Sequence, residues 1–162
     1  MPTEDRGREA LDLALGLVSR RPLTRTEVRD RLVAAGHDPS EASAAVDRLV
    51  ASGILDDARL ASHYLLTRSE RLGHGRERLT AELLRRGVEP EVVEGAFDRA
   101  VADGDFDPGT QLAREVERRV AGAGGALDRK RYARVYNALL RAGFDPGAVA
   151  AALERYRSDA GD

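Results

Sequence analysis

Three copies of one short pattern decide the fold of this 162-residue chain: LVAAGHDP at residues 32–39, LLRRGVEP at 83–90 and LLRAGFDP at 139–146. In each copy, apolar residues precede a Gly by four and three positions, and a Pro follows that Gly by three. Gly ends a helix in the left-handed conformation without strain. Pro suits the first position of the next helix, where its missing N–H is no loss. Each copy therefore predicts two helices joined by a tight turn.

The residues before each anchor Gly continue the pattern. Val28, Leu79 and Val135 stand eight residues before it and place the apolar groups on one stripe of a helix. A further helix precedes each pair, with candidates at Glu9–Arg20, Asp57–Leu72 and Thr110–Ala121. Because three short helices bury little surface alone, neighbouring units must stack.

We therefore predict an all-α fold without a sheet, made of three tandem three-helix repeats that form an elongated, curved array. The repeats span residues 8–55, 56–104 and 107–157. Aromatic residues are 4% of the chain and Trp is absent, so the core must come from Leu, Val and Ala, which suits closely packed helices.

Several polar residues have structural interpretations. Thr24 and Glu27 have the spacing of a capping box. Asp56 and Asp57 directly precede a helix, so we interpret them as capping residues rather than paired catalytic carboxylates. The stretch Gly73–Gly75 follows no predicted strand, so it separates two helices rather than holding a phosphate.

The composition argues against an enzyme, a cofactor and a metal site. The chain has no Cys, and its three histidines, His37, His63 and His74, have neither ligand spacing nor a catalytic partner set. We interpret each as a surface or turn residue. The sequence shows no nucleophile elbow and no Walker motif. A signal peptide and a long apolar run are also missing, so we expect a cytoplasmic protein without membrane contact, and a monomer.

Charge is distributed unevenly along the chain. The formal net charge is −2, yet residues 59–86 carry seven basic and three acidic side chains, and residues 110–141 carry eight and three. Residues 87–109 between them carry one basic and seven acidic side chains. Such asymmetry points to a charged partner.

The second and third repeats share a basic stripe. Arg78 and Arg134 hold one repeat position, and Arg85 and Arg141 hold another, seven residues or two helical turns away. The first repeat has an acid and an alanine at these positions. Further basic residues extend the two blocks: Arg68, Arg71, Arg76, Arg86, Arg118, Arg119, Arg129, Lys130 and Arg131. We expect contact with phosphates or with an acidic protein groove; the alternative is a solvated face in a chain that uses 25 Arg and one Lys.

Two tyrosines accompany the second basic block. Tyr132 and Tyr136 are four residues apart and therefore lie on one face of a helix. We favour packing over base stacking for this pair.

The chain also resembles the RecX family of regulatory proteins. The resemblance is strongest in the middle, and its residues are Ile54–Ala61, Tyr64, Arg68, Gly73–Gly75, Arg78-Leu79, Glu82-Leu83 and Arg86–Val88. Flanking stretches add to it at Ala10-Leu11, Ser19–Arg21, Thr24–Val28, Leu32 and Leu139–Phe144. Leu60 stands where Phe is commoner, and Arg76 stands where Pro is commoner.

The resemblance implies a modular protein that binds the recombinase RecA as a filament on single-stranded DNA and inhibits its ATPase and strand exchange. That role belongs to DNA recombination, DNA repair and the SOS response. Weak nonspecific DNA contact is compatible with it. The alternative is a direct DNA-binding protein that uses its helix pairs like helix-turn-helix units.

Overall fold

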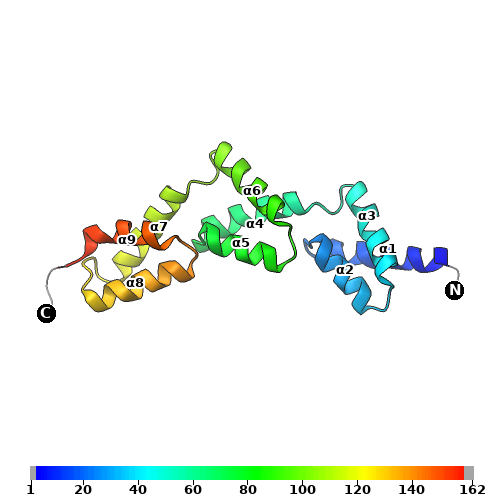
Figure 1. The fold of residues 1–162 in the computed structure, drawn as a ribbon, viewed down its shortest axis with the longest axis horizontal. Helices are drawn as coiled ribbons and strands as arrows, with labels where there is room; N and C mark the ends of the chain where they lie inside the picture. The colour runs from blue at the N-terminus through cyan, green and yellow to red at the C-terminus, as the bar shows by residue number, and fades with distance from the viewer. Residues whose placement is uncertain (1–2, 159–162) are drawn as a thin grey trace. The chain divides into compact units, whose positions relative to one another are not determined.

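The computed structural model describes residues 3–158, and over these residues the chain forms nine α-helices and one short 3-10 helix (Figure 1). The elements are α1 Thr3–Arg20, α2 Arg25–Ala34, α3 Pro39–Ala51, α4 Asp57–Leu72, α5 Arg76–Arg85, α6 Pro90–Ala102, α7 Pro108–Gly122, α8 Arg129–Arg141, α9 Pro146–Leu153 and η1 Glu154–Tyr156. The only β-type pairing in the described residues is an isolated bridge between Leu127 and Arg157. The all-α prediction is confirmed.

The three anchor glycines end helices as predicted. Gly36, Gly87 and Gly143 have φ angles of +98°, +83° and +95°. In each turn the N–H after the Gly donates to the carbonyl four residues before the Gly, as in His37 to Leu32 at 3.1 Å. This pattern is the Schellman motif, which satisfies carbonyls that the helix end leaves unpaired.

Two of the three leading helices are longer than predicted. α4 covers the predicted range, but α1 begins at Thr3 rather than Glu9, and α7 covers Pro108–Gly122 rather than Thr110–Ala121. Asp107 explains the early start of α7, because its carboxylate accepts hydrogen bonds from the backbone of Gly109 and Thr110. This acid–Pro start repeats the pattern that opens the last helix of each repeat.

The chain divides into two compact units. The first comprises residues 1–63 and 83–96. Within it, α1, α2 and α3 pack against one another (Figure 1) around a core of small and aliphatic side chains. That core consists of Ala10, Ala14, Leu23, Val28, Leu32, Ala42, Ala45, Val46, Leu49 and Leu55.

The second unit comprises residues 64–82 and 97–162. Its α7, α8 and α9 enclose a second core of Leu112, Val116, Val120, Leu127, Val135, Leu139, Ala142, Phe144, Val149 and Leu153. The rings of Phe97 and Phe106 meet edge to face with centroids 5.2 Å apart. The division passes through α4, α5 and α6, so the predicted repeat boundaries stay a prediction.

A helix start docks on an anchor glycine inside each unit. In the first unit, the hydroxyls of Thr24 and Thr26 at the start of α2 donate to the carbonyls of Arg86 and Gly87, at 2.7 Å and 3.1 Å. We call this contact between the start of α2 and the end of α5, together with the side chains beside it, the first junction. Adding a Cβ to Gly87 would bring it within 2.5 Å of Thr26, so only Gly allows this close approach.

The second unit contains an equivalent contact. At the start of α5, the backbone N–H groups of Gly75 and Glu77 donate to the carbonyls of Ala142 and Gly143, at 2.7 Å and 3.2 Å. We call this contact between the start of α5 and the end of α8, together with the side chains beside it, the second junction. Gly75 and Glu77 lie 51 residues after Thr24 and Thr26, the same interval that separates Gly87 from Gly36. The two junctions therefore have the same register.

None of the helices in the described part of the chain has both the length and the apolar character of a membrane span.

Candidate basic interaction surface

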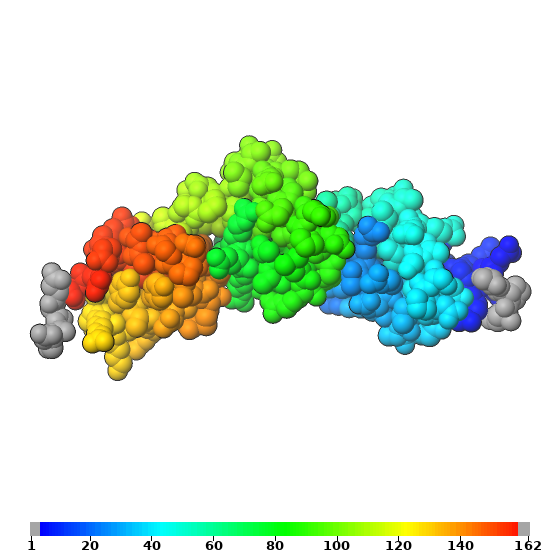
Figure 2. Space-filling model, in the orientation of Figure 1, coloured from blue at the N-terminus to red at the C-terminus, as the bar shows by residue number. Residues whose placement is uncertain are grey.

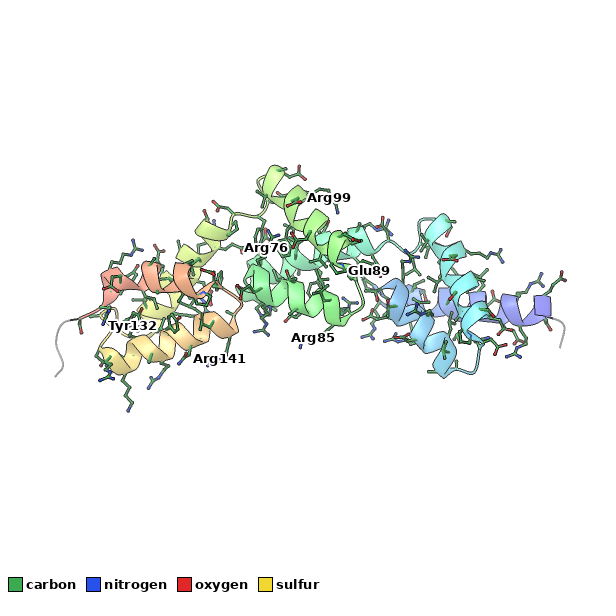
Figure 3. The ribbon with its side chains drawn as sticks, viewed as in Figure 1. Arg76, Arg85, Glu89, Arg99, Tyr132 and Arg141 are labelled. Carbon is green, nitrogen blue, oxygen red and sulfur yellow. The ribbon has the colours of Figure 1, made fainter. Side chains whose placement is uncertain are left out.

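The predicted basic stripe lies on α5 and α8. Arg85, Arg134 and Arg141 are exposed, and Figure 3 shows Arg85 at the end of α5 and Arg141 at the end of α8. Arg78 is partly engaged, because its Nε donates to Glu82 Oε1 at 2.9 Å and its Nη1 to the carbonyl of Arg141 at 3.4 Å. Arg78 is therefore part of the exposed basic stripe and also contacts the second junction.

The start of α8 carries four basic residues, Arg129, Lys130, Arg131 and Arg134, and no acidic one. Arg129, Lys130 and Arg134 are exposed and form no ion pair with any described residue. Arg131 lies 3.7 Å from Asp128, whose carboxylate also accepts the Arg131 N–H at 2.8 Å and so caps α8. This backbone hydrogen bond lowers the pKa of Asp128. In the space-filling view α8 lies at the surface, yellow to orange (Figure 2).

The two tyrosines of α8 pack on the core edge. The rings of Tyr132 and Tyr136 are stacked, with centroids 6.1 Å apart and planes 11° from parallel. Both pack half-buried against the core, and the Arg157 guanidinium lies 5.3 Å from the Tyr132 ring. The predicted packing role is confirmed.

Arg86, another predicted site residue, is held inside the first unit. Its Nε and Nη2 donate to the two carboxylate oxygens of Glu27, each at 2.9 Å, and Nη2 also reaches the Pro22 carbonyl at 3.2 Å. Burial alone raises the pKa of Glu27, but the hydrogen bonds from Arg86 and from the Thr24 N–H outweigh it and lower the pKa. Arg86 therefore stabilises the first junction.

Arg118 and Arg119 share one buried carboxylate. Glu115 on α7 has a side chain that is 7% exposed, and it accepts from Arg118 Nε at 3.1 Å and from Arg119 Nε at 2.8 Å. Burial raises the pKa of Glu115, while these two guanidinium groups lower it further than burial raises it. A buried carboxylate needs such partners, so both arginines have a structural role here.

The remaining predicted arginines lie on α4 and α5. The guanidinium of Arg68 is 4.9 Å from the Tyr64 ring, and that of Arg76 is 4.5 Å from the Phe97 ring, as cation–π contacts. Arg71 is exposed and lines a cleft. The structure thus gathers the predicted residues into several groups rather than one continuous stripe.

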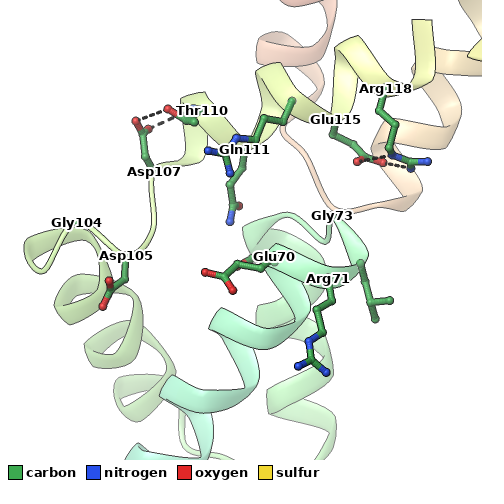
Figure 4. Close-up of a pocket in the computed structure, with 13 residues that line it drawn as sticks. Glu70, Arg71, Gly73, Gly104, Asp105, Asp107, Thr110, Gln111, Glu115 and Arg118 are labelled. Atoms are coloured by element: carbon green, nitrogen blue, oxygen red, sulfur yellow. Dashed lines mark hydrogen bonds and ion pairs between the residues drawn. The ribbon is translucent and has the colours of Figure 1, made fainter. Parts of the chain in front are cut away.

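The cleft that Arg71 lines has a volume of about 560 Å³ (Figure 4). It is lined by the end of α4, the turn before α7 and the first turns of α7. Both signs of charge face it, from Glu70 and Asp105 as well as Arg71 and Arg114. Gln111 Oε1 is buried there without a hydrogen-bond partner among the described residues. The mixed charges select no single ligand.

Two residues important to the second unit were not among the predicted site residues. His74 lies in a turn as expected, but its side chain is buried rather than on the surface, and its Nδ1 has no hydrogen-bond partner in the described residues. Glu82 accepts from Tyr64 at 2.8 Å as well as from Arg78. The pairing of Glu82 with Arg78 has the four-residue spacing of a helical ion pair and so had a local signal. Its contact with Tyr64 on α4, 18 residues earlier, had none.

The described residues contain no group of His, Cys, Asp and Glu side chains that could hold a metal ion. Folded helical triplets with basic helices at the surface define a class of protein: an all-helical modular protein built from three-helix domains.

Comparisons with known proteins identify the family within this class. The profile described as "RecX, first three-helix domain" matches residues 10–49, and the one described as "RecX, second three-helix domain" matches residues 56–96. The Regulatory protein RecX of Halorhodospira halophila is 38% identical over 141 residues, which cover 87% of this chain and 84% of that protein. The one from Xanthomonas oryzae pv. oryzae is 35% identical over 93% of this chain and 94% of that protein. The chain belongs to the RecX family of regulatory proteins.

The fold is also similar to a solved structure. The crystal structure of RecX from Lactobacillus salivarius has a TM-score of 0.79 with 18% sequence identity and covers 94% of this chain and 97% of that one. At that identity the likeness concerns the fold.

Proposed function

We propose that this chain binds RecA assembled on single-stranded DNA and inhibits its ATP hydrolysis and strand exchange. The supporting observation is membership of a family of regulatory proteins together with a basic α8 surface. α8 carries five basic and no acidic residues in Arg129–Arg141. The proposal describes a cytoplasmic monomer without catalysis of its own.

The mechanism is occupancy. Exposed arginines present planar forks that fit carboxylates on a protein or phosphates on DNA. A helical protein held against the filament by such contacts blocks the rearrangements that each ATPase cycle requires. The chain then acts through its surface and needs no reactive group.

The test measures RecA ATPase on single-stranded DNA with and without this protein. Inhibition is expected for the wild type and strongly reduced inhibition for the triple variant Arg129→Glu, Lys130→Glu and Arg134→Glu, whose side chains are exposed and unpaired among the described residues. Arg78 is left intact, because an acid there would face Glu82 across a broken ion pair.

A matched control places three reversals on the first unit, at Arg8, Arg20 and Arg48, which are also exposed. This variant is expected to inhibit like the wild type. Equal loss in both triple variants, or full inhibition by the α8 variant with its helical spectrum intact, would contradict the assignment of α8.

Direct DNA binding is the second candidate, because the same five basic residues of α8 could contact phosphates. Binding without RecA, with an affinity that falls steeply as salt rises, would favour it. Weak binding of this kind is compatible with the RecA proposal.

A further inference from the structure

The second junction adjoins a small cationic pocket. The pocket has a volume of about 180 Å³, and Arg78 from α5, Arg119 from α7 and Arg141 from α8 line it together with His74. Its remaining walls are the apolar side chains of Leu72 on α4, Ala138 on α8 and Ala142 directly after α8. Pockets for drug-sized molecules begin at roughly 300 Å³. A single small group fits this one better than a nucleobase.

Positive charge exceeds negative charge around this pocket. Arg78 donates to Glu82, and Arg119 shares Glu115 with Arg118. The Arg141 guanidinium forms no ion pair with any described residue. Three guanidinium groups therefore line the pocket and no carboxylate does, so the pocket favours an anion.

The first junction shows how an arginine at this place in a repeat binds a carboxylate. There, the Glu27 carboxylate accepts two parallel hydrogen bonds from Arg86. The repeat equivalent of Glu27 in the second junction is Arg78, and the equivalent of Arg86 is Ala142. The internal acid is thus replaced by a cation and its arginine by a small residue. At these two positions the second junction therefore has no equivalent of the Glu27–Arg86 pair, and the nearby Arg141 forms no ion pair with any described residue.

From this substitution we infer that the pocket lined by His74, Arg78, Arg119 and Arg141 binds one phosphate oxyanion, supplied by a nucleic-acid backbone or by free phosphate. Arginine forks match a phosphate in the bidentate way that Arg86 matches Glu27. The inference rests on the junctions and not on RecA binding. Its test uses the chain alone, so the two proposals can fail separately.

The buried His74 reports on occupancy. It faces Arg78 and Glu82 on α5, Arg68 on α4, and Glu115 and the pocket arginines on α7 and α8. Burial lowers the pKa of His74, and the charge of Arg78 lowers it further. The imidazole is therefore harder to protonate than a free one, and its Nδ1 has no hydrogen-bond partner among the described residues. A bound dianion stabilises the imidazolium and raises this pKa.

The experiment follows the His74 imidazole by NMR in the full chain. Inorganic phosphate is titrated at constant ionic strength, with chloride as the control anion. The pKa of His74 is then measured in the presence of sulfate, because the charge of sulfate is constant near neutral pH. We expect a saturable shift with phosphate and a raised pKa with sulfate. No response beyond that to chloride would overturn the inference.

Two variants with the same charge change locate the site. Arg141→Gln removes an exposed guanidinium from the pocket and is expected to weaken phosphate binding about tenfold, the effect of one charge-assisted hydrogen bond. Arg99→Gln removes an exposed guanidinium of α6 that does not line the pocket (Figure 3), and is expected to bind phosphate like the wild type. Equal weakening in both variants, with both folded by circular dichroism, would also overturn the inference.

An oligothymidylate arm separates the two sources of phosphate. If the nucleic-acid backbone supplies the group, the oligonucleotide shifts the His74 signal, free phosphate competes, and Arg141→Gln lowers the salt dependence by about one charge. If free phosphate alone shifts it, the pocket binds the free ion. Both outcomes support the oxyanion site.

Discussion

The two junctions have one geometry and different chemistry. In the first, the side-chain hydroxyls of Thr24 and Thr26 donate to the two carbonyls at the end of α5. In the second, the backbone N–H groups of Gly75 and Glu77 donate to the corresponding carbonyls at the end of α8. The acceptors are backbone carbonyls in both. The docking register is therefore preserved although the donors differ.

The difference also extends to charge. The first junction contains a complete ion pair between Glu27 and Arg86, both about a quarter exposed. The second has Arg78 and Ala142 at those positions and leaves arginines facing a pocket. A repeat can thus keep its backbone contacts while the side chains around them change from a structural ion pair to a surface that accepts an anion.

The largest expected effect comes from alanine at the anchors. A Cβ at Gly143 would overlap Arg78, including its backbone N, whereas the three atoms nearest to one at Gly87 all belong to the Thr26 side chain. Gly143→Ala should lower the free energy of unfolding by about 4 kcal/mol or more, the range of severe steric damage. Gly87→Ala should have a smaller effect. Gly36→Ala, with open space around its Cβ, should show only the left-handed strain of about 1–2 kcal/mol. Urea unfolding followed by circular dichroism measures all three, and equal losses would contradict the comparison.

A double-mutant cycle sharpens the same point. Thr26→Gly removes the three atoms that would lie nearest to a Cβ at Gly87. The pair Gly87→Ala and Thr26→Gly should therefore be more stable than the sum of the single effects predicts. The corresponding pair Gly143→Ala and Arg78→Gly should show less coupling, because the backbone of residue 78 still blocks the Cβ.

The turns could be predicted from the sequence, and the contacts of the turns could not. Gly36 and its two equivalents end helices because the local Gly-x-x-Pro pattern determines the turn. The docking of α2 on Gly87 depends on Thr26, which lies 61 residues away. No common residue type marks that position, since its equivalent in the second repeat is Glu77, which uses its backbone.

The residues of the candidate site also divide into those that the local sequence predicts and those whose role depends on distant partners. The exposed arginines of α8 follow from helical spacing. Arg86 resembles them in sequence, but its partner Glu27 is 59 residues away, so its structural role has no local signal. The structural role of Arg118 and Arg119 does have a local signal, because Glu115 precedes them by three and four residues, which is the spacing of helical ion pairs.

A second prediction compares one arginine from each junction. Arg86→Gln leaves Glu27 half-buried without its charged partner and should lower the free energy of unfolding by about 1.5–3 kcal/mol. Arg78→Gln breaks an ion pair whose arginine side chain is 41% exposed, and should lower it by about 0.5 kcal/mol or less. Thermal and urea unfolding at neutral pH measure the loss of stability in both variants. A larger loss for Arg78→Gln than for Arg86→Gln would contradict the interpretation of Glu27–Arg86 as the structural ion pair.

The pH dependence gives a third prediction about the first junction. The pKa of Glu27 is lowered from its ordinary value of 4.5, so this carboxylate stabilises the fold above that value and the stabilisation is lost as pH falls through the lowered pKa. The difference in unfolding free energy between wild type and Arg86→Gln should therefore shrink below about pH 4.5. A difference that stays constant into the acid range would show that Arg86 acts through packing instead of charge.

The smallest expected effect concerns Gly36, the anchor that receives no helix start. Its carbonyl accepts from Arg6 Nη2 at 3.3 Å, and the same guanidinium lies 3.3 Å from Glu41. Arg6→Ala should lower the free energy of unfolding by about 0.5 kcal/mol or less, because the arginine side chain is 39% exposed and the contact exchanges with water. Arg8→Ala, an exposed neighbour on α1, is the control for helix propensity. A loss at Arg6 as large as that at Arg86 would mean that α1 closes Gly36 as firmly as α2 closes Gly87, and the comparison would then have to include three junctions rather than two.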